Sequence, residues 1–194
     1  MKTDDWLKLG ISASWYFLLA WWLWSARGTK AAVRGEPWMT RLFLYWLPLV
    51  LAFVLLGPGE WYGHHWLREG IVPHTTPFFA TALLIVVAGV ALACWSRYLL
   101  GRNWSSVVQI KQAHELIEAG PYRYIRHPIY TGILLAFIGT AIQVGDVRGI
   151  FAVLIVFVSF WRKLRMEERM LGETFGDVYA AYKRRTSALI PRVF

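Results

Sequence analysis

Five apolar segments, separated by polar or basic links, are the feature that most limits how this chain can fold. The segments cover about residues 9–26, 42–56, 78–100, 129–144 and 149–161. A helix needs roughly 20 residues to cross a bilayer, and the last two segments are shorter than that. The pattern predicts an all-α integral membrane protein with five transmembrane helices. The last two would form a short hairpin around the link 145–148.

Composition favours the same class. Hydrophobic residues make up 57% of the 194 residues and charged residues 17%, which is too apolar and too poor in charge for a typical soluble domain. Twelve tryptophans agree, because indole rings favour the membrane interface. The first segment follows Asp4 and Asp5 and reaches Arg27 without a convincing cleavage site, so we expect a retained span. Cys94 lies in an apolar run and is expected to be a buried, inert thiol.

The formal net charge of +9 indicates a basic cytoplasmic face on anionic lipid, rather than a protein that binds nucleic acid. Basic residues gather in the link after the first segment, in the stretch 101–128 and in the tail from 162. The link 57–77 and the turn at Asp146 are poor in charge. With five spans, the three basic parts share one side. The positive-inside rule then predicts an N-terminus outside and a cytoplasmic C-terminus and active site, in the inner membrane.

The polar stretch from His114 to Tyr130 contains the triplet Arg126-His127-Pro128. Proline suits the first turn of a helix, where its missing N–H costs nothing, so the fourth span should begin at Pro128. Free N–H groups and the positive end of the helix dipole favour an anion there, and Arg126 adds a fixed cation. The alternative, which spacing alone favours, is that Arg126 and His127 lie among lipid headgroups.

A second charged patch, Lys163 to Glu168, follows the fifth segment. Lys163 and Glu167 are four residues apart, and Arg165 and Glu168 are three apart. Ordinary ion pairing on a solvated helix explains this spacing and contributes only about 0.3–0.5 kcal/mol a pair. Alternatively, one carboxylate binds an ammonium group and one cation holds an anionic substrate. We hypothesise that the hairpin brings both patches together in one site.

Taken in order, these residues resemble the isoprenylcysteine carboxyl methyltransferase family of integral membrane enzymes, in a prokaryotic form. The resemblance covers roughly the C-terminal half, whereas the N-terminal half matches only as generic spans. Its most specific parts are the RHPxY element and the EE…FGxxYxxY tail. The matching residues are Leu100-Gly101-Arg102-Asn103-Trp104-Ser105, Gln109, His114-Glu115-Leu116-Ile117, Gly120, Tyr122, Arg126-His127-Pro128, Tyr130, Gly132, Glu167-Glu168, Leu171, Phe175-Gly176, Tyr179, Tyr182 and Pro191.

The resemblance implies S-adenosyl-L-methionine as methyl donor and no metal. Since no GxGxxG turn follows a strand, a soluble-type Rossmann site is not supported. Residues 1–100 would form a membrane anchor and 101–194 the catalytic region, within one structural domain. Catalytic residues would be Arg126, Glu167 and Glu168. By position, the cofactor pocket would be lined by Gln109, His114, Glu115, Leu116, Ile117, Tyr122, His127, Pro128, Ile129, Tyr130 and Glu167.

The resemblance also implies a basic substrate contact four residues before Glu167. Lys163 occupies that position, where family members often have arginine, and Arg165 is close by. Both are therefore candidates for substrate binding. Lysine lacks the planar fork with which arginine binds a carboxylate bidentately.

The expected reaction is direct in-line methyl transfer to a lipophilic acceptor such as a prenylated cysteine, beside membrane lipid. An acceptor carboxylate is already ionised and needs no general base. A thiol or a phospholipid amine must lose a proton, and His114 or Glu168 are the candidate bases. Aromatic rings would cover the adenine or face the sulfonium. Two alternatives from other classes are a non-catalytic membrane scaffold and a reductase or transporter of similar architecture.

Overall fold

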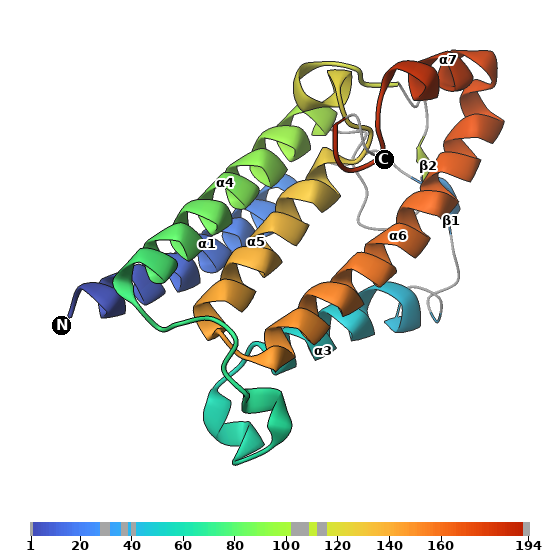
Figure 1. Ribbon diagram of the computed structural model, residues 1–194. Coiled ribbons are helices and arrows are strands. Elements are labelled where there is room, and N and C mark those ends of the chain that lie inside the picture. The colour runs from blue at the N-terminus through green and yellow to red at the C-terminus, as the bar shows by residue number, and fades with distance from the viewer. Residues whose placement is uncertain are drawn as a thin grey trace.

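The computed structural model describes residues 2–27, 32–35, 39, 42–101, 109–111 and 116–191. Four long helices, α1, α4, α5 and α6, run between two ends of the molecule, and α3 lies beside α6 (Figure 1). The elements are α1 (Thr3–Ser25), β1 (Ala32–Gly35), the π-helical turn η1 (Leu42–Trp46), α3 (Leu47–Leu55), η2 (Gly59–Tyr62), η3 (Trp66–Arg68), α4 (Thr76–Leu100), β2 (Gln109–Lys111), η5 (Gly120–Arg123), α5 (Pro128–Val144), α6 (Val147–Phe175) and α7 (Asp177–Arg185).

The apolar segments predicted near 78–100 and 129–144 correspond to α4 and α5, and α5 begins at Pro128 as expected. The fifth segment differs from the prediction. We expected a short span to end near residue 161, but α6 continues without a break for 29 residues to Phe175. No proline interrupts this sequence, and Lys, Arg, Met and Glu are good helix formers, so the change from apolar to charged residues does not end the helix.

Hydrogen bonds tie together the links at each end of the molecule. Near the start of α4, Thr76 donates to Asp4 of α1, and the backbone of Ile71 donates to Gly145 of the α5–α6 turn. Gly145 has φ +73°, a conformation that favours glycine, and it ends α5. The N-terminus therefore shares one end with the two links that are poor in charge.

The opposite end contains the basic parts. β1 pairs antiparallel with β2, which joins the first link to the long polar stretch. The backbone N–H of Arg126 donates to the carbonyl of Ser187, which joins that stretch to the tail. This relative placement is the one that the charge pattern predicts, whereas the compartment that each end faces stays a prediction. The helical fold class is as predicted, and the short strand pair is a local addition to it.

The core is formed where α5 packs between α4 and α6. Gly89 of α4 and Gly132 of α5 face each other, and a Cβ on either would meet the backbone of the other helix. Small residues of this kind let two helix backbones approach closely. Trp15 of α1 donates a hydrogen bond to Thr140 of α5, with 2.9 Å between Nε1 and Oγ1, and stacks edge-on against Phe137. The close packing of α5 fixes the place of its N-terminus, where the candidate site lies.

Of the described helices, α4 alone is long and apolar enough to cross a membrane by length and composition. Leu42–Leu55 and Pro128–Val144 are shorter apolar helices. Large apolar side chains are nevertheless exposed on several elements, among them Tyr16 of α1, Leu84 of α4 and Leu154 of α6. Apolar surface spread over several helices is typical of contact with lipid or another protein. The count of five spans stays a prediction.

Candidate active site

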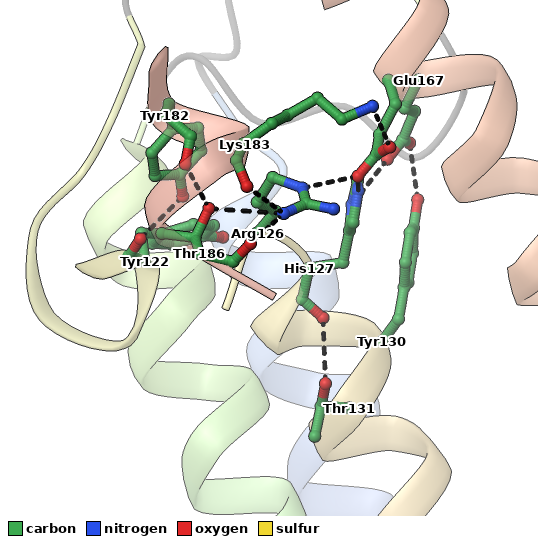
Figure 2. Close-up of polar contacts among 10 residues, drawn as sticks. Tyr122, Arg126, His127, Tyr130, Thr131, Glu167, Tyr182, Lys183 and Thr186 are labelled. Atoms are coloured by element: carbon green, nitrogen blue, oxygen red, sulfur yellow. Dashed lines mark hydrogen bonds and ion pairs between the residues drawn. The ribbon is translucent and has the colours of Figure 1, made fainter. Parts of the chain in front are cut away.

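The imidazole of His127 lies between the two carboxylates of α6 at the basic end of the molecule (Figure 2). Its Nδ1 is 3.4 Å from a Glu167 oxygen and its Nε2 is 3.5 Å from a Glu168 oxygen. Tyr130, on the first turn of α5, donates a hydrogen bond of 2.5 Å to Glu167. The structure therefore brings the two charged patches together, although they lie far apart in the sequence.

Arg126 connects three segments of the chain. Its Nε donates to Glu168 at 2.6 Å, and its Nη1 donates to the carbonyls of Thr186 and Lys183. Lys183 itself forms an ion pair with Glu168, with 3.0 Å between Nζ and Oε2. Arg126 is thus engaged with the α6 carboxylate and the tail, so its position suits holding the site together. We call Arg126, His127, Glu167, Glu168 and Lys183 the carboxylate cluster.

The tail completes this arrangement by pairing with the chain before α5. The backbone of Arg126 donates to Ser187 and that of His127 to Ala188, and Ser187 donates to Tyr124. Thr131 adds a side-chain hydrogen bond of 2.8 Å to the carbonyl of Leu189. The polar backbone around His127 is therefore satisfied by the tail, and the ring is held in a buried position.

Charge complementarity fixes the ionisation of the cluster. Burial lowers the pKa of His127, but the carboxylates of Glu167 and Glu168, 3.4 and 3.5 Å from its ring nitrogens, outweigh burial, and the net shift is upward. Burial raises the pKa of both carboxyls. For Glu167 the nearby His127 ring and the charge of Lys163 reverse that effect, and for Glu168 the nearby His127 ring and the contacts with Arg126 and Lys183 do so. The histidine therefore tends to be protonated and both glutamates ionised.

Aromatic rings line the side of the cluster that faces α6 and η1. Tyr130 stacks on His127, with 5.5 Å between ring centroids, and on Phe160 at 4.8 Å. The buried Lys163 places its Nζ 4.8 Å from the centroid of the Tyr45 ring and 5.4 Å from that of Tyr130. This wall combines a cation, two stacked π faces and the carboxylate of Glu167, whose side chain is 22% exposed.

Lys163 and Arg165 lie on different faces of α6. Lys163 is buried toward Glu167, whereas Arg165 is exposed. Two residues along an α-helix are about 200° apart, so both cannot point into one site. Glu168 pairs with Arg126 and Lys183 rather than with the predicted Arg165. Lys163 remains the candidate for substrate binding at the site.

The remaining predicted cofactor residues have different positions. Tyr122 is buried, its hydroxyl lies 3.4 Å from the carbonyl of Ser96, and its own carbonyl accepts a hydrogen bond from Tyr182. Pro128 and Ile129 are buried in the first turn of α5. Leu116 and Ile117 are half-buried, and for Gln109 the structure describes the backbone in β2. His114 and Glu115 lie outside the described residues.

Sequence reasoning missed Lys183, Thr186 and Tyr45. Lys183 directly follows Tyr182, the last residue of the FGxxYxxY element, so its place beside that element was a usable signal. Tyr45 lies in η1 and contacts both Met166 and Lys163. Its sequence surroundings are plainly apolar and gave no signal. Among the described residues, no group of three or more His, Cys, Asp or Glu side chains is placed to hold a metal ion.

Comparison with known proteins gives the family. A model of the family described as phospholipid methyltransferase matches residues 77–178, which is more than half of the chain. The matched range contains α5 and α6 and ends at the start of α7. The chain belongs to the phospholipid methyltransferase family. The predicted relationship to isoprenylcysteine methyltransferases is also confirmed, because the curated relatives below have that name.

Two relatives in this family are the protein-S-isoprenylcysteine O-methyltransferases of Mus musculus, 34% identical over 115 residues, and of Homo sapiens, 33% identical over 114 residues. The matches cover 58% and 57% of this chain but 41% and 40% of the relatives. The chain thus spans about two fifths of the length of these relatives. The enzyme of the same name from Arabidopsis thaliana (form B) is 27% identical, over 57% of this chain and 58% of that protein.

A solved structure supports the fold. The eukaryotic intramembrane Ras methyltransferase (isoprenylcysteine carboxyl methyltransferase) superposes with a TM-score of 0.58, over 77% of this chain and 52% of that one. The sequence identity is 24%, so this similarity concerns the helical architecture alone. It agrees with the predicted fold class for a member of the phospholipid methyltransferase family.

Proposed function

We propose that this protein is an integral membrane methyltransferase that uses S-adenosyl-L-methionine to methylate the carboxylate of a lipophilic, prenylcysteine-like acceptor. The observation that supports this most is the carboxylate cluster, in which a partly exposed Glu167 lies among His127, Tyr130 and Lys163. The similarity to protein-S-isoprenylcysteine O-methyltransferases supports the acceptor class.

The described residues fit the methionine end of this cofactor. Glu167 is the carboxylate on the open side of the cluster and would bind the ammonium group. His127 is buried, and its Nε2 lacks a well-formed hydrogen bond among the described residues, because its 3.5 Å approach to Glu168 is long. A buried donor without such a partner is suited to an anionic group. When bound, S-adenosyl-L-methionine would supply an electrophilic methyl group for direct in-line transfer.

The residues around this site would orient and shield the reactants. Arg126 and Lys183 hold Glu168, so that the second carboxylate stays in place and keeps His127 protonated. Tyr130 fixes the orientation of Glu167 through its hydrogen bond. The stacked rings of Tyr130 and Phe160 exclude water from one side and present π faces that favour a cation. Lys163 would attract the anionic acceptor.

The ionisation of the cluster favours a carboxylate acceptor. The raised pKa favours the protonated form of His127, and the lowered pKa values make Glu167 and Glu168 weaker bases than ordinary carboxylates. A carboxylate needs no base, whereas an amine or thiol must lose a proton during transfer. The described part of the cluster is thus suited to an acceptor that is already ionised. His114, the other candidate base, lies outside the described residues.

A second candidate is methylation of a phospholipid amine, which the description of the family favours. One experiment separates the two. Purified protein in detergent is given methyl-labelled S-adenosyl-L-methionine with farnesylcysteine, phosphatidylethanolamine or a long-chain thiol. We expect label in a base-labile methyl ester of farnesylcysteine. Label in the phospholipid amine instead would replace the first candidate by the second, and no transfer to any acceptor would contradict both.

A further inference from the structure

An open groove of about 300 Å³ lies between α6 and the continuous stretch formed by η1 and the first turn of α3. This volume is at the small end of the range for ligand sites. Its walls are mostly apolar and include Leu44, Pro48, Leu154 and Val158. Ser159, which also lines the groove, donates a hydrogen bond of 2.7 Å to the carbonyl of Leu44. The serine thus holds η1 against α6, and the groove surface is left apolar.

The groove runs along α6 toward the basic end of the molecule. Leu154, Val158 and Arg162 line it at four-residue spacing, so they form one row on the helix. Arg162 is the charged residue in the lining and stands where the row reaches that end. An apolar groove with a cation at one end is complementary to an amphiphile that has a hydrocarbon chain and an anionic head group.

Two further arginines extend the charge beyond the groove. Arg162, Arg165 and Arg169 are all exposed and follow one another at spacings of three and four residues on α6. Within the described part of the chain, none of them forms an ion pair. Of the carboxylates that follow on the same helix, Glu167 and Glu168 face the carboxylate cluster, and the exposed Glu173 lies one turn after Arg169. Around Arg162 and Arg165, the outer face of α6 therefore presents cations that form no ion pair within the described part of the chain.

We propose that this groove binds an acyl chain of an anionic phospholipid, whose phosphate lies at Arg162 and Arg165. The exposed apolar walls suit a hydrocarbon chain, and the guanidinium groups suit a phosphate. An anionic surface attracts each nearby arginine by an amount that corresponds to about a fivefold gain in binding. The site lies outside the carboxylate cluster, so this inference does not rest on the proposed reaction.

The test measures lipid binding to the full-length chain in detergent by native mass spectrometry, without cofactor. Phosphatidylglycerol is compared with phosphatidylcholine that carries the same acyl chains. We expect the anionic lipid to bind about fivefold more tightly or better. Arg162→Gln should remove most of that preference, and Val158→Trp, which fills the groove, should weaken the binding of both lipids.

Two matched variants control for general effects. Arg184→Gln removes an exposed charge from α7 at the same end, and Leu84→Trp enlarges an exposed apolar side chain on α4. Both should bind lipid as the wild type does. Equal binding of the two lipids by the wild type would overturn the proposal. So would an Arg184→Gln variant that loses as much preference as Arg162→Gln. Thermal melting of each variant identifies any that is misfolded, and Arg162→Gln, a surface change, keeps the test decisive if Val158→Trp does not fold.

Discussion

Each end of the molecule contains an arginine paired with a carboxylate, and these two arginines, whose side chains are 9% and 6% exposed, have different roles. At the end that is poor in charge, Arg148 pairs with Asp146 at 3.0 Å and donates to the carbonyls of Leu55 and Gly57. Its guanidinium also lies over the Tyr62 ring. At the basic end, Arg126 makes a similar set of contacts, with Glu168 and with two carbonyls of the tail.

The difference lies in what surrounds each pair. Asp146 and Arg148 are two residues apart, and their charges cancel locally. Because Arg148 also donates to the carbonyl of Leu55, it joins the α5–α6 turn to the end of α3. The carboxylate cluster instead collects two carboxylates and several cations from α5, α6 and α7. It also leaves Glu167 partly exposed and His127 Nε2 without a well-formed hydrogen bond within the described chain. We therefore interpret the isolated Asp146–Arg148 pair as structural. The carboxylate cluster contains further polar groups whose hydrogen bonds are incomplete, and we interpret it as a binding site.

Removing either arginine should give the largest effect on stability. Arg148→Ala leaves the buried Asp146 without its partner and should lower the free energy of unfolding by about 3–5 kcal/mol, whereas Arg126→Ala leaves Glu168 paired with Lys183 and should cost less. Denaturant unfolding in detergent measures this loss. Methyl transfer per folded molecule should fall for Arg126→Ala only. If Arg148→Ala lost as much activity per folded molecule, the two ends would not differ in function as we argue.

Glu167→Gln should weaken binding of S-adenosyl-L-methionine, and it should also lower stability because the charge that pairs with His127 and Lys163 is lost, although glutamine can still accept from Tyr130. Loss of a hydrogen bond to a charged group corresponds to about 1.5–3 kcal/mol, or roughly 10- to 150-fold in affinity. Titration calorimetry measures it. Asp146→Asn, the matched change at the other end, should bind the cofactor normally. Wild-type affinity in Glu167→Gln would remove Glu167 from the proposed pocket.

The carboxylate cluster should make stability depend on pH in two directions. Glu167 and Glu168 have lowered pKa values in the folded state, so their contribution is present above about pH 4.5 and is lost as pH falls through the folded values. His127 has a raised pKa, so its contribution is present below about pH 6.5 and is lost as pH rises through the folded value. Stability should be greatest between these limits.

Glu168→Gln tests this pH dependence. The free energy of unfolding of this variant, measured across pH, should fall less steeply in acid than that of the wild type. The difference in free energy between the two proteins should shrink by about 1–3 kcal/mol as the medium becomes acid. Arg185→Gln, which alters an exposed pair at the same end, should keep the wild-type shape. An unchanged acid limb in Glu168→Gln would mean that other groups dominate acid unfolding.

The smallest effect is expected at an exposed pair of the basic end. Arg185 and Glu118 form an ion pair in which the side chains are 53% and 35% exposed. Arg185→Gln should therefore change the free energy of unfolding by less than about 1 kcal/mol. Thermal melting of Arg185→Gln and of Arg126→Ala under the same conditions compares the two losses of stability. A loss as large as that of Arg126→Ala would show that charge at this end, rather than burial, sets the energies.

Sequence by itself determined the apolar segments and where helices begin. The length of α4, the start of α5 at Pro128 and the opposition of basic and charge-poor ends all follow from local composition and from proline's missing N–H. The ordered motif around Arg126-His127-Pro128 and Glu167-Glu168 also indicated the family that the comparisons show. These features are local, so the order of residues is sufficient to specify them.

Tertiary structure decided which side chains meet. The separation of Lys163 from Arg165 depends on the continuous α6 helix, and the engagement of Arg126 depends on the tail folding back to Thr186 and Lys183. The position of Tyr45 beside Lys163 depends on how η1 packs against α6. Contacts between residues this far apart in the chain arise from the packing of whole helices, and the local sequence of any one segment does not contain that information.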